Sequence, residues 1–372
     1  MKILQSCLSR SWGGMEMYTV TTVKELANLG HDVTLLCYPG SKIYESATTA
    51  GMKVKTVMAK SYFHPLEILK LTRLLKKEKY DVVHTHASKD LWLIVPALKI
   101  SGLKTPLFLT KHVGSFINKK DLLHKFLYGR VNTVFAISSI IKKNLLETTP
   151  LPESKIEILH NGIDTGKMNP GKSDGEKIRS EFGITKREIV IGMIARFTWG
   201  KGHEEFLQAA GLLRNKFTHL KFLIVGEASR GEENYESKIK KLADDLGLRD
   251  VVIFTGYRED IPDLLDAMDI FVFPSHSEAF GIALIEAMAL GTPSVCSDSN
   301  GILDIAVNGE TSLLFKTKDA QDLTKKLEQL IVSEELRKRL GNASRMRAIE
   351  KFEIKKLIQL LIEYYRKLSK TT

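Results

Sequence analysis

The sequence is poor in cysteine and contains no long hydrophobic run. Its three cysteines, Cys7, Cys37 and Cys296, are scattered and odd in number, which argues against a disulfide framework and predicts buried free thiols in a reducing compartment. No stretch of about 18 apolar residues occurs, so we expect no membrane-spanning helix. The N-terminus lacks the apolar stretch of a signal peptide and favours a first β-strand. These absences indicate a cytoplasmic protein.

Two motifs of common enzyme classes are also missing. No Gly-x-Gly-x-x-Gly follows an expected strand, and the nearest fragment, from Gly226 to Gly231, has the wrong spacing, which disfavours a nicotinamide dehydrogenase. His84 and His86 point to the same face of a strand, but two histidines without a nearby cysteine or Asp-x-Asp cluster are too few for zinc. We therefore expect neither a catalytic metal nor a bound cofactor.

Acidic residues are scarce in one part of the chain. The net charge is +11, and residues 1–165 contain 23 Lys and Arg against 13 Asp and Glu, whereas residues 166–351 are nearly balanced. The final segment, 352–372, is basic again. This asymmetry predicts that one domain meets an anionic surface or substrate, with a charge that serves only solubility as the alternative.

The length of 372 residues is too great for one compact core, and short apolar runs alternate with helical patterns in both halves. This rhythm predicts an α/β protein with two doubly wound, Rossmann-like domains of mainly parallel sheet. A Gly-, Asn- and Asp-rich linker at 161–175 separates residues 1–165 from residues 166–351. The last helix, 354–370, shares the basic character of the first domain, so we expect 352–372 to cross back to it. Open sheets of this kind bind ligands at the carboxyl ends of their strands, which favours a site in a cleft between the domains.

The expected strands and helices follow from these runs. The strands are 2–8, 31–38, 53–57, 81–86, 106–112, 133–137 and 155–159 in the first half, and 189–195, 220–225, 251–255, 270–273 and 293–297 in the second. The longer helices are 14–29, 65–79, 91–100, 121–128, 139–147, 203–216, 233–246, 260–268 and 280–290, and residues after 316 are expected to be entirely helical.

The most informative motif is the pair of carboxylates Glu278 and Glu286 around the start of a helix. The helix is expected to open near Phe280 and Gly281, which places Glu286 roughly 8 Å along its axis. Free amides at a helix start suit a phosphate, and Gly281 permits a close approach. Carboxylates on either side suit hydroxyl groups. The motif therefore indicates a sugar–diphosphate–ribose ligand, with two solvated glutamates on an ordinary helix as the alternative.

A second motif, Arg196 to Gly202, follows the first strand of the second half. Arg196 can clamp two oxygens and Lys201 can act as a mobile charge, which suits a diphosphate. Surface cations near a turn are the alternative. In the first half, Gly13 and Gly14 open the first helix and would let a substrate approach the backbone, although they also suit an ordinary tight turn.

Two further features of the first half suit contact with a sugar and with anionic headgroups. His112 ends a strand and could contact sugar or transfer a proton, although such a histidine is more often structural. Helix 65–79 is amphipathic and basic, with Leu66, Leu69 and Leu74 expected on the core side and the basic face of Lys70, Arg73 and Lys77 available to anionic headgroups. A solvated basic face is the alternative.

Together these motifs resemble the retaining GT-B glycosyltransferases of the family 4 type. The resemblance rests on Gly13-Gly14-x-Glu16, Asn161-Gly-Ile-Asp164, Arg196 with Lys201, Glu278-x7-Glu286 and the following Gly-Thr-Pro-Ser-Val. It covers nearly the whole chain and is strongest over residues 190–315.

The resemblance implies a role for each matching position. Glu286 would hold the donor's ribose and Glu278 would lie near the transferred sugar, while Arg196 and Lys201 would support the leaving diphosphate. The amides of Phe280, Gly281 and Ile282 would contact diphosphate or sugar. In the first domain, Gly14 would lie beside the phosphates, His112 would contact the donor sugar, and Glu16 would contribute to acceptor binding.

The function implied is transfer of a sugar from a nucleoside diphosphate sugar to a lipid-linked or polysaccharide acceptor, as in lipopolysaccharide or cell-envelope glycan synthesis. The first domain would bind the acceptor and the second the donor, with retained configuration and no metal. We expect a cytoplasmic protein, in peripheral contact with an anionic membrane, and no nucleic-acid partner. A nucleotide-sugar epimerase of the same fold and a non-catalytic sugar-nucleotide-binding subunit remain alternatives.

Overall fold

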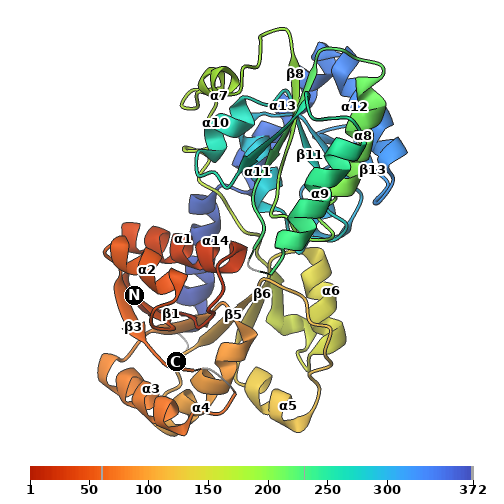
Figure 1. The fold of residues 1–372 in the computed structure, drawn as a ribbon. Coiled ribbons are helices and arrows are strands. Elements are labelled where there is room, and N and C mark those ends of the chain that lie inside the picture. Colours follow the sequence, from red (N-terminus) through yellow and green to blue (C-terminus); the bar gives the residue numbers. More distant parts are fainter. Residues whose placement is uncertain (60–61, 230, 370–372) are drawn as a thin grey trace. The chain divides into compact units, whose positions relative to one another are not determined.

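The computed structural model describes residues 1–59, 62–229 and 231–369 (Figure 1). The chain forms two compact units, Met1–Asn161 with Lys355–Thr372, and Gly162–Ile354. The sequence placed the division at 165 and the return at 352. Each unit has its own parallel sheet with helices on both faces, which confirms the predicted fold class.

The first unit is built on a seven-stranded parallel sheet in the order β3-β2-β1-β4-β5-β6-β7. Its strands are β1 (Lys2–Cys7), β2 (Asp32–Cys37), β3 (Lys53–Thr56), β4 (Val82–Thr85), β5 (Leu107–Lys111), β6 (Thr133–Ala136) and β7 (Ile156–Ile158). Its helices are α1 (Gly14–Asn28), α2 (Lys42–Thr49), α3 (Pro65–Glu78), η1 (Ser88–Asp90), α4 (Leu91–Ser101), α5 (Leu122–Gly129), α6 (Ser139–Thr148), η2 (Glu153–Lys155) and α14 (Ile354–Ser369). The strand order reverses between β1 and β4.

The second unit is built on a six-stranded parallel sheet in the order β10-β9-β8-β11-β12-β13, which reverses between β8 and β11. Its strands are β8 (Ile189–Ile194), β9 (Leu220–Val225), β10 (Val252–Gly256), β11 (Ile270–Phe273), β12 (Ser294–Ser297) and β13 (Ser312–Phe315). Its helices are α7 (Gly175–Glu181), α8 (His203–Arg214), α9 (Glu233–Asp245), α10 (Ile261–Asp266), α11 (Ile282–Leu290), η3 (Asn300–Asp304), α12 (Ala320–Val332) and α13 (Glu334–Lys351).

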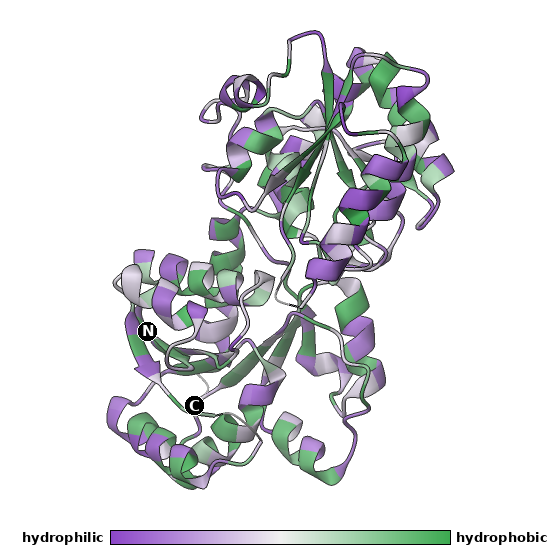
Figure 2. Ribbon diagram, viewed as in Figure 1, coloured by the Kyte–Doolittle hydropathy of each residue, from purple (hydrophilic) through white to green (hydrophobic). Residues whose placement is uncertain are grey.

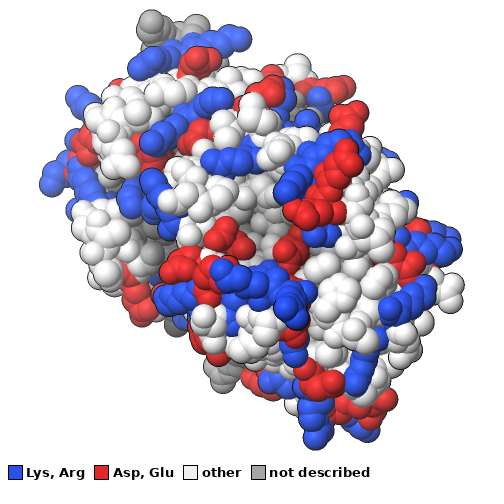
Figure 3. Space-filling model, turned by 90° about the horizontal axis from the view of Figure 1, so that it is seen from above, with Lys and Arg blue, Asp and Glu red and all other residues white. Residues whose placement is uncertain are grey.

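The central strands of the second sheet, β8 and β11, are apolar throughout, whereas β1 and β4 of the first sheet also bury polar side chains such as Gln5 and His84. Residues such as Ile191, Phe222 and Val272 are buried, because helices on both faces leave neither side of a parallel sheet to water. Figure 2 shows the strands mainly hydrophobic and the surrounding helices divided between apolar and polar faces. On the surface drawn in Figure 3, basic and acidic side chains lie interspersed.

The C-terminal helix packs in the first unit, as predicted. Tyr365 of α14 is fully buried, and its hydroxyl contacts Gln5 Nε2 at 3.0 Å and His84 Nδ1 at 2.5 Å. The outgoing and returning segments pair inside the second unit, where Ile163 N donates to Phe352 O and Ile354 N donates to Ile163 O. The predicted linker is therefore held by main-chain hydrogen bonds where the returning chain meets it.

Several sequence predictions of local structure are wrong. β13 lies in a stretch for which no strand was predicted. The short helices α2 and α7 were not predicted either. Helix α11 begins at Ile282 and not near Phe280, because Gly281 adopts φ +141°, outside the helical region. Residue 370 of the predicted last helix lies outside the described residues.

The predicted orientation of the basic helix is also wrong. Leu66 and Leu69 of α3 are exposed, and the buried apolar positions are Ile68, Leu71 and Leu75. These three follow the i, i+3, i+7 spacing that packs on α4. The exposed face of α3 consequently carries leucines as well as Lys70, Arg73 and Lys77.

All three cysteines are buried and free, as predicted. Burial raises the pKa of Cys37 and of Cys296 to about 12, so their thiols are inert at neutral pH. Across the described residues, no helix is both long and apolar enough to cross a bilayer.

Candidate functional site

The strongest candidate site of the second unit lies where its strand order reverses. Arg196 to Gly202 form the loop after β8, and Pro274 to Gly281 form the loop after β11. Carboxyl ends of neighbouring parallel strands meet at one edge, and a reversal of strand order opens a crevice there. The two motifs recognised in the sequence are therefore adjacent in space.

Glycine geometry fixes the two loops against each other. Gly202 has φ +80°, and a Cβ at this position would lie 2.3 Å from Pro274 O. No side chain larger than hydrogen fits without moving one loop. The main chain joins them as well, because His276 N donates to Gly200 O at 2.8 Å. The residues carried by these loops are thus held in a defined arrangement.

Lys201 and Glu278, predicted separately for diphosphate and sugar, contact each other. Their ammonium and carboxylate form an ion pair, with 25% and 17% of the side chains exposed. Arg196 is exposed and donates to Ser229 Oγ at 2.9 Å instead. A ligand diphosphate would therefore have to draw Lys201 from a neutralised pair, while Arg196 is held only by a neutral hydroxyl.

The start of α11 completes the group of anion-binding elements. Gly281 is its N-cap residue, no side chain caps the helix, and its first turn contains no acidic residue. Ile282 is the first helical residue, and Phe280 is buried with its ring 5.8 Å from that of Phe352. A Cβ at Gly281 would approach Phe273 to 3.2 Å, which again favours glycine. The uncapped amides of this turn carry the positive end of the helix dipole.

Glu286 lies four residues after Ile282, about 6 Å along α11. Its residue surface is partly exposed, but the surrounding protein desolvates the carboxyl group and raises its pKa to about 7. At neutral pH it is divided between charged and neutral forms. Such a carboxyl group can release its proton to solvent and then accept hydrogen bonds from ligand hydroxyls.

Sequence reasoning missed the loop after β12, which supports the Glu278 loop. Ser297 and Ser299 donate to Ser275 O at 2.5 and 3.2 Å. Asn300 Nδ2 donates to Ser277 Oγ at 2.7 Å, and Gly301 N donates to Glu278 O at 3.1 Å. Serines and asparagines after a strand are common in any loop, so no local signal could have identified these contacts.

In the first unit, His112 lies at the end of a chain of buried polar groups. Gln5 Oε1 lies 2.9 Å from His86 Nε2, and His86 Nδ1 lies 3.1 Å from His112 Nε2. Tyr365 and His84 extend the chain at its other end, through Gln5 Nε2. The sequence predicted His84 and His86 on one face but not this connection.

Burial and hydrogen bonding together determine the protonation of this chain. Desolvation lowers the pKa of His86 to about 3 and holds the pKa of His84 and His112 well below the usual range, so all three imidazoles are neutral. Gln5 donates to Tyr365, so its carbonyl accepts from His86 Nε2–H. His86 Nδ1 then accepts from His112 Nε2–H. The remaining atom, His112 Nδ1, is a buried acceptor that has no hydrogen-bond partner among the described residues.

Gly14 and Glu16 lie in the first turn of α1. Gly14 is exposed, and Glu16 is 3% exposed, close to the positive end of the helix. Within the part of the chain that the structure describes, the Glu16 carboxylate makes no hydrogen bond. Its predicted role at the acceptor stays a prediction, as do the individual ligand contacts predicted for the other site residues.

Two family profiles match consecutive parts of the chain. The family described as Glycosyltransferase Family 4 matches residues 12–167, and the family described as Glycosyl transferases group 1 matches residues 174–347. The first match falls in the unit with the histidine chain. The second contains all of Arg196, Lys201, Glu278 and Glu286.

Characterised relatives align over nearly their full length. N,N'-diacetylbacillosaminyl-diphospho-undecaprenol alpha-1,3-N-acetylgalactosaminyltransferase of Campylobacter jejuni is 26% identical over 362 residues, covering 92% of this chain and 93% of the relative. UDP-Gal:alpha-D-GlcNAc-diphosphoundecaprenol alpha-1,3-galactosyltransferase of Escherichia coli is 25% identical over 370 residues, covering 95% and 93%.

Solved structures share the fold. A glycosyltransferase from Rickettsia africae superimposes with a TM-score of 0.90 at 25% identity, covering 100% of this chain and 99% of that one. Anabaena Alr3699/HepE, solved in complex with UDP and glucose, gives 0.82 at 21% identity and covers 98% and 99%.

Proposed function

Because this chain belongs to the GT-B glycosyltransferases of the family 4 type, we propose that it transfers a sugar, with retained configuration, from a nucleoside diphosphate to a lipid-linked acceptor. The second unit binds the donor and the first binds the acceptor. The observation that carries the proposal is the convergence of Lys201, Glu278 and the uncapped start of α11 at one edge of a sheet.

The charges of this edge suit a diphosphate leaving group. As the bond from the anomeric carbon to the diphosphate breaks, negative charge develops on the diphosphate oxygen. Lys201, Arg196 and the α11 amides supply fixed positive charge there, which lowers the barrier. With these groups in place the reaction needs no metal ion, so full activity is expected in excess EDTA, and strict metal dependence would contradict this part of the proposal.

Retention follows if the acceptor oxygen attacks the face that the diphosphate leaves. The new bond joins the acceptor oxygen to the anomeric carbon, and the hydroxyl proton passes to the departing diphosphate oxygen. In this scheme the protein supplies no nucleophile, and Glu278 and His112 orient the sugar. An NMR spectrum of the first-formed product gives its anomeric configuration, and inversion would overturn the scheme.

A lipid-linked acceptor is supported by the two relatives whose names contain diphosphoundecaprenol and by the surface of the first unit. Leu66, Phe116 and Leu122 are 72%, 106% and 82% exposed, and Lys70 and Lys120 lie close to them in sequence. Apolar side chains beside basic ones suit an anionic bilayer. We propose peripheral membrane contact through this unit.

Liposome sedimentation tests the membrane contact. Vesicles containing anionic lipid are expected to retain the protein at low salt and to lose a large part of it at high salt, because exposed charges are screened. Equal binding to neutral vesicles, or none to either kind, would contradict the proposal. The double variant Lys70→Gln/Lys120→Gln should bind more weakly, and Lys216→Gln, in the second unit, is the matched control.

The donor is tested by a thermal-shift screen of UDP-, GDP- and ADP-sugars. One of them is expected to raise the melting temperature of the wild type, because ligand binding stabilises the native state, and not that of Glu286→Ala. An epimerase would convert the selected donor without an acceptor. Recovery of unchanged donor after prolonged incubation would exclude that alternative.

A further inference from the structure

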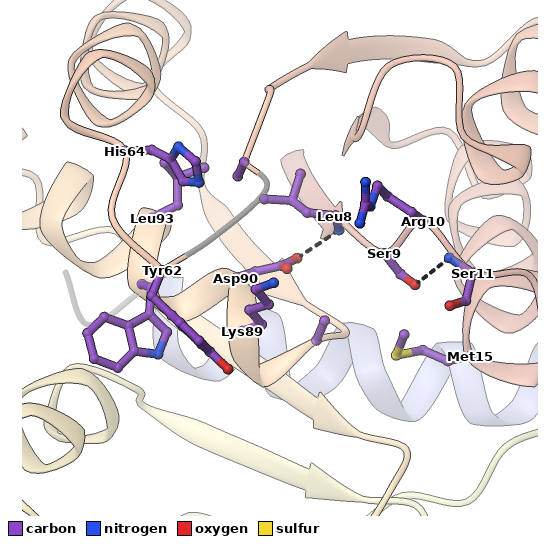
Figure 4. Close-up of a pocket in the computed structure, with 13 residues that line it drawn as sticks. Leu8, Ser9, Arg10, Ser11, Met15, Tyr62, His64, Lys89, Asp90 and Leu93 are labelled. Atoms are coloured by element: carbon purple, nitrogen blue, oxygen red, sulfur yellow. Dashed lines mark hydrogen bonds between the residues drawn. The ribbon is translucent and has the colours of Figure 1, made fainter.

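The first unit contains a pocket of about 460 Å³, lined by both polar and apolar side chains, at its own reversal of strand order. It lies at the carboxyl ends of β1 and β4, between the loop after β1 and the turn η1. Figure 4 shows Arg10, Ser9 and Ser11 on one side and Tyr62 and His64 on the other. This is the position at which an open α/β sheet binds its ligand.

The charge of this pocket suits an anion. Arg10 and Lys89 line it, and Asp90 is the one acidic residue among the described side chains of its wall. The Asp90 carboxylate is turned inward and accepts hydrogen bonds from Ser6 Oγ at 2.7 Å, Leu8 N at 3.1 Å and Thr85 Oγ1 at 3.2 Å. These three hydrogen bonds all engage Asp90 Oδ2 inside the protein, while Arg10 and Lys89 supply the positive charge of the pocket wall.

A second pocket, also of about 460 Å³, lies beside the first and is lined almost entirely by apolar atoms. It is formed by α3, α4 and α5, which lie next to one another in Figure 1. Its lining includes Tyr62, Leu69, Trp92, Ile100, Leu123 and Phe126. Such a volume and lining are typical of a pocket for an apolar small molecule.

The two pockets share one aromatic wall. Tyr62 and Trp92 line both, and their rings meet edge to face with centroids 5.3 Å apart. Lys89 Nζ lies 5.2 Å from the centre of the Tyr62 ring, so a positive charge stands at the boundary between the two pockets. A ligand that filled both pockets would have its charged group beside Lys89 and its apolar chain beyond Tyr62 and Trp92.

From this arrangement we propose that the two pockets form one binding site for a phosphate- or diphosphate-linked lipid, with the phosphate at Arg10 and Lys89 and the first part of the lipid chain in the apolar pocket. The inference rests on the proposed function, because it assigns the place where the acceptor is held. It goes beyond membrane contact, since it predicts that a single lipid molecule binds without a bilayer.

A lipid phosphate carries an anionic group next to an apolar chain. This combination matches the cations of one pocket and the apolar lining of the other. A free phosphate would leave the apolar pocket exposed to water, and an apolar peptide would bring no anionic group to Arg10 and Lys89. Burial of chain carbons adds to affinity in proportion to their number. Binding should therefore require both halves of the ligand.

Three probes separate the halves: farnesyl diphosphate, farnesol and inorganic pyrophosphate, titrated calorimetrically below any micelle-forming concentration. The wild type is expected to bind farnesyl diphosphate about tenfold or more tightly than either of the others, because the chain buries many CH₂ groups. Equal affinities for farnesyl diphosphate and pyrophosphate would overturn the proposal.

Variants then assign each half to its pocket. Ile100→Ser/Phe126→Ser should reduce the affinity for farnesyl diphosphate to that for pyrophosphate and leave pyrophosphate binding unchanged. Lys89→Gln should weaken both phosphorylated probes and not farnesol. Ile100 and Phe126 are 54% and 47% exposed, so their replacement removes little core packing. Unchanged affinity in the double variant would refute the assignment.

Matched controls come from outside the pockets. Leu212→Ser/Val332→Ser changes two side chains that are 44% and 71% exposed in the second unit, and Lys99→Gln removes a charge from α4 outside both linings. Both should behave as the wild type. If the apolar pocket instead holds a second copy of this chain, sedimentation will show a dimer that Ile100→Ser/Phe126→Ser dissociates, which contradicts the lipid proposal.

A parallel titration with the nucleotide sugar separates failure of the lipid site from failure of the proposed function. Normal donor binding together with failure of farnesyl diphosphate would refute this inference and leave the donor site intact. Loss of donor binding would refute the proposed function, whereas lipid binding would still be measured separately.

Discussion

The carboxyl edges of the two sheets present different kinds of chemical group. In the second unit the edge presents charge and main-chain amides, with Lys201 paired to Glu278 beside the uncapped α11. In the first unit it presents neutral, buried imidazoles and, at the strand reversal, a pocket lined by Arg10 and Lys89 that shares an aromatic wall with an apolar pocket. Under the proposed function, the diphosphate would be held by charged groups and main-chain amides on two adjacent loops, whereas the acceptor would be held by pockets assembled from several elements.

The largest effects are expected from the charged edge. Lys201→Ala should reduce kcat by about 100-fold or more, as removal of one group that stabilises developing charge typically does. Glu286→Ala should reduce activity comparably by releasing the ribose. Steady-state kinetics on the donor selected by the screen measure both.

Lys216→Ala is the control for these changes, since Lys216 forms an ion pair with Glu328 away from the site. It should retain wild-type turnover. If Lys201→Ala and Glu286→Ala were folded and also had near-normal turnover, the donor site could not lie at this edge of the second sheet.

A glycine pair tests the packing of the two donor loops. Gly202→Ala places a Cβ 2.3 Å from Pro274 O, whereas Gly200→Ala meets nothing within 4 Å although both residues have positive φ. Both changes should cost about 1 kcal/mol or more of stability from backbone strain, and Gly202→Ala clearly more. Thermal unfolding compares them, and equal losses would show that the close approach is unimportant.

The pKa of Glu286 predicts how donor affinity depends on pH. Burial raises this pKa to about 7, so the carboxyl group is largely protonated at pH 6 and ionised at pH 8. Ribose hydroxyls bind the ionised form, so affinity should rise by roughly tenfold between these values, the change in the ionised fraction for a pKa of 7.

Glu286→Gln should bind the donor more weakly and without this pH dependence. Calorimetric titration at both pH values gives the comparison. An unchanged slope in the variant would assign the titration to another group.

The smallest effect is expected from the far end of the histidine chain. Tyr365→Phe leaves Gln5 Nε2 and His84 Nδ1 without partners and should cost about 1–3 kcal/mol of stability. It should lower kcat by a few-fold without changing the KM for the donor, because Gln5 no longer fixes the tautomers of His86 and His112.

Imidazole ¹⁵N chemical shifts provide a readout that a purely structural role would not change. The wild type should show neutral histidines with the proton on Nε2, and Tyr365→Phe should show a mixture. Tyr364→Phe, at the neighbouring partly exposed position, is the control and should leave the shifts unchanged.

The sequence predicted what is local. The fold class, most strands and the motifs containing Lys201 and Glu286 follow from periodicity and from spacings of a few residues, and the return of the last helix follows from its basic charge. The contact of Lys201 with Glu278 joins residues far apart in the chain and could be expected only after both loops had been placed on one sheet edge.

The failures have a common physical cause. The orientation of α3 was predicted wrongly, since its leucines occur on two faces and only packing on α4 decides which face is buried. The chain from Tyr365 to His112 depends on four strands and helices meeting, and the pocket wall of Tyr62 and Trp92 on a loop meeting a helix. Neither type of contact leaves a pattern in a single stretch of sequence.

The most direct test of the central claim is a crystal structure of the protein with the nucleoside diphosphate that the thermal-shift screen selects. The account predicts a Glu286 oxygen within about 2.6–3.2 Å of a ribose hydroxyl. It also predicts the diphosphate at the start of α11, with Lys201 moved from Glu278 onto a phosphate oxygen. A nucleotide bound elsewhere, or at this edge with the Lys201–Glu278 pair intact and Glu286 without contact, would contradict it.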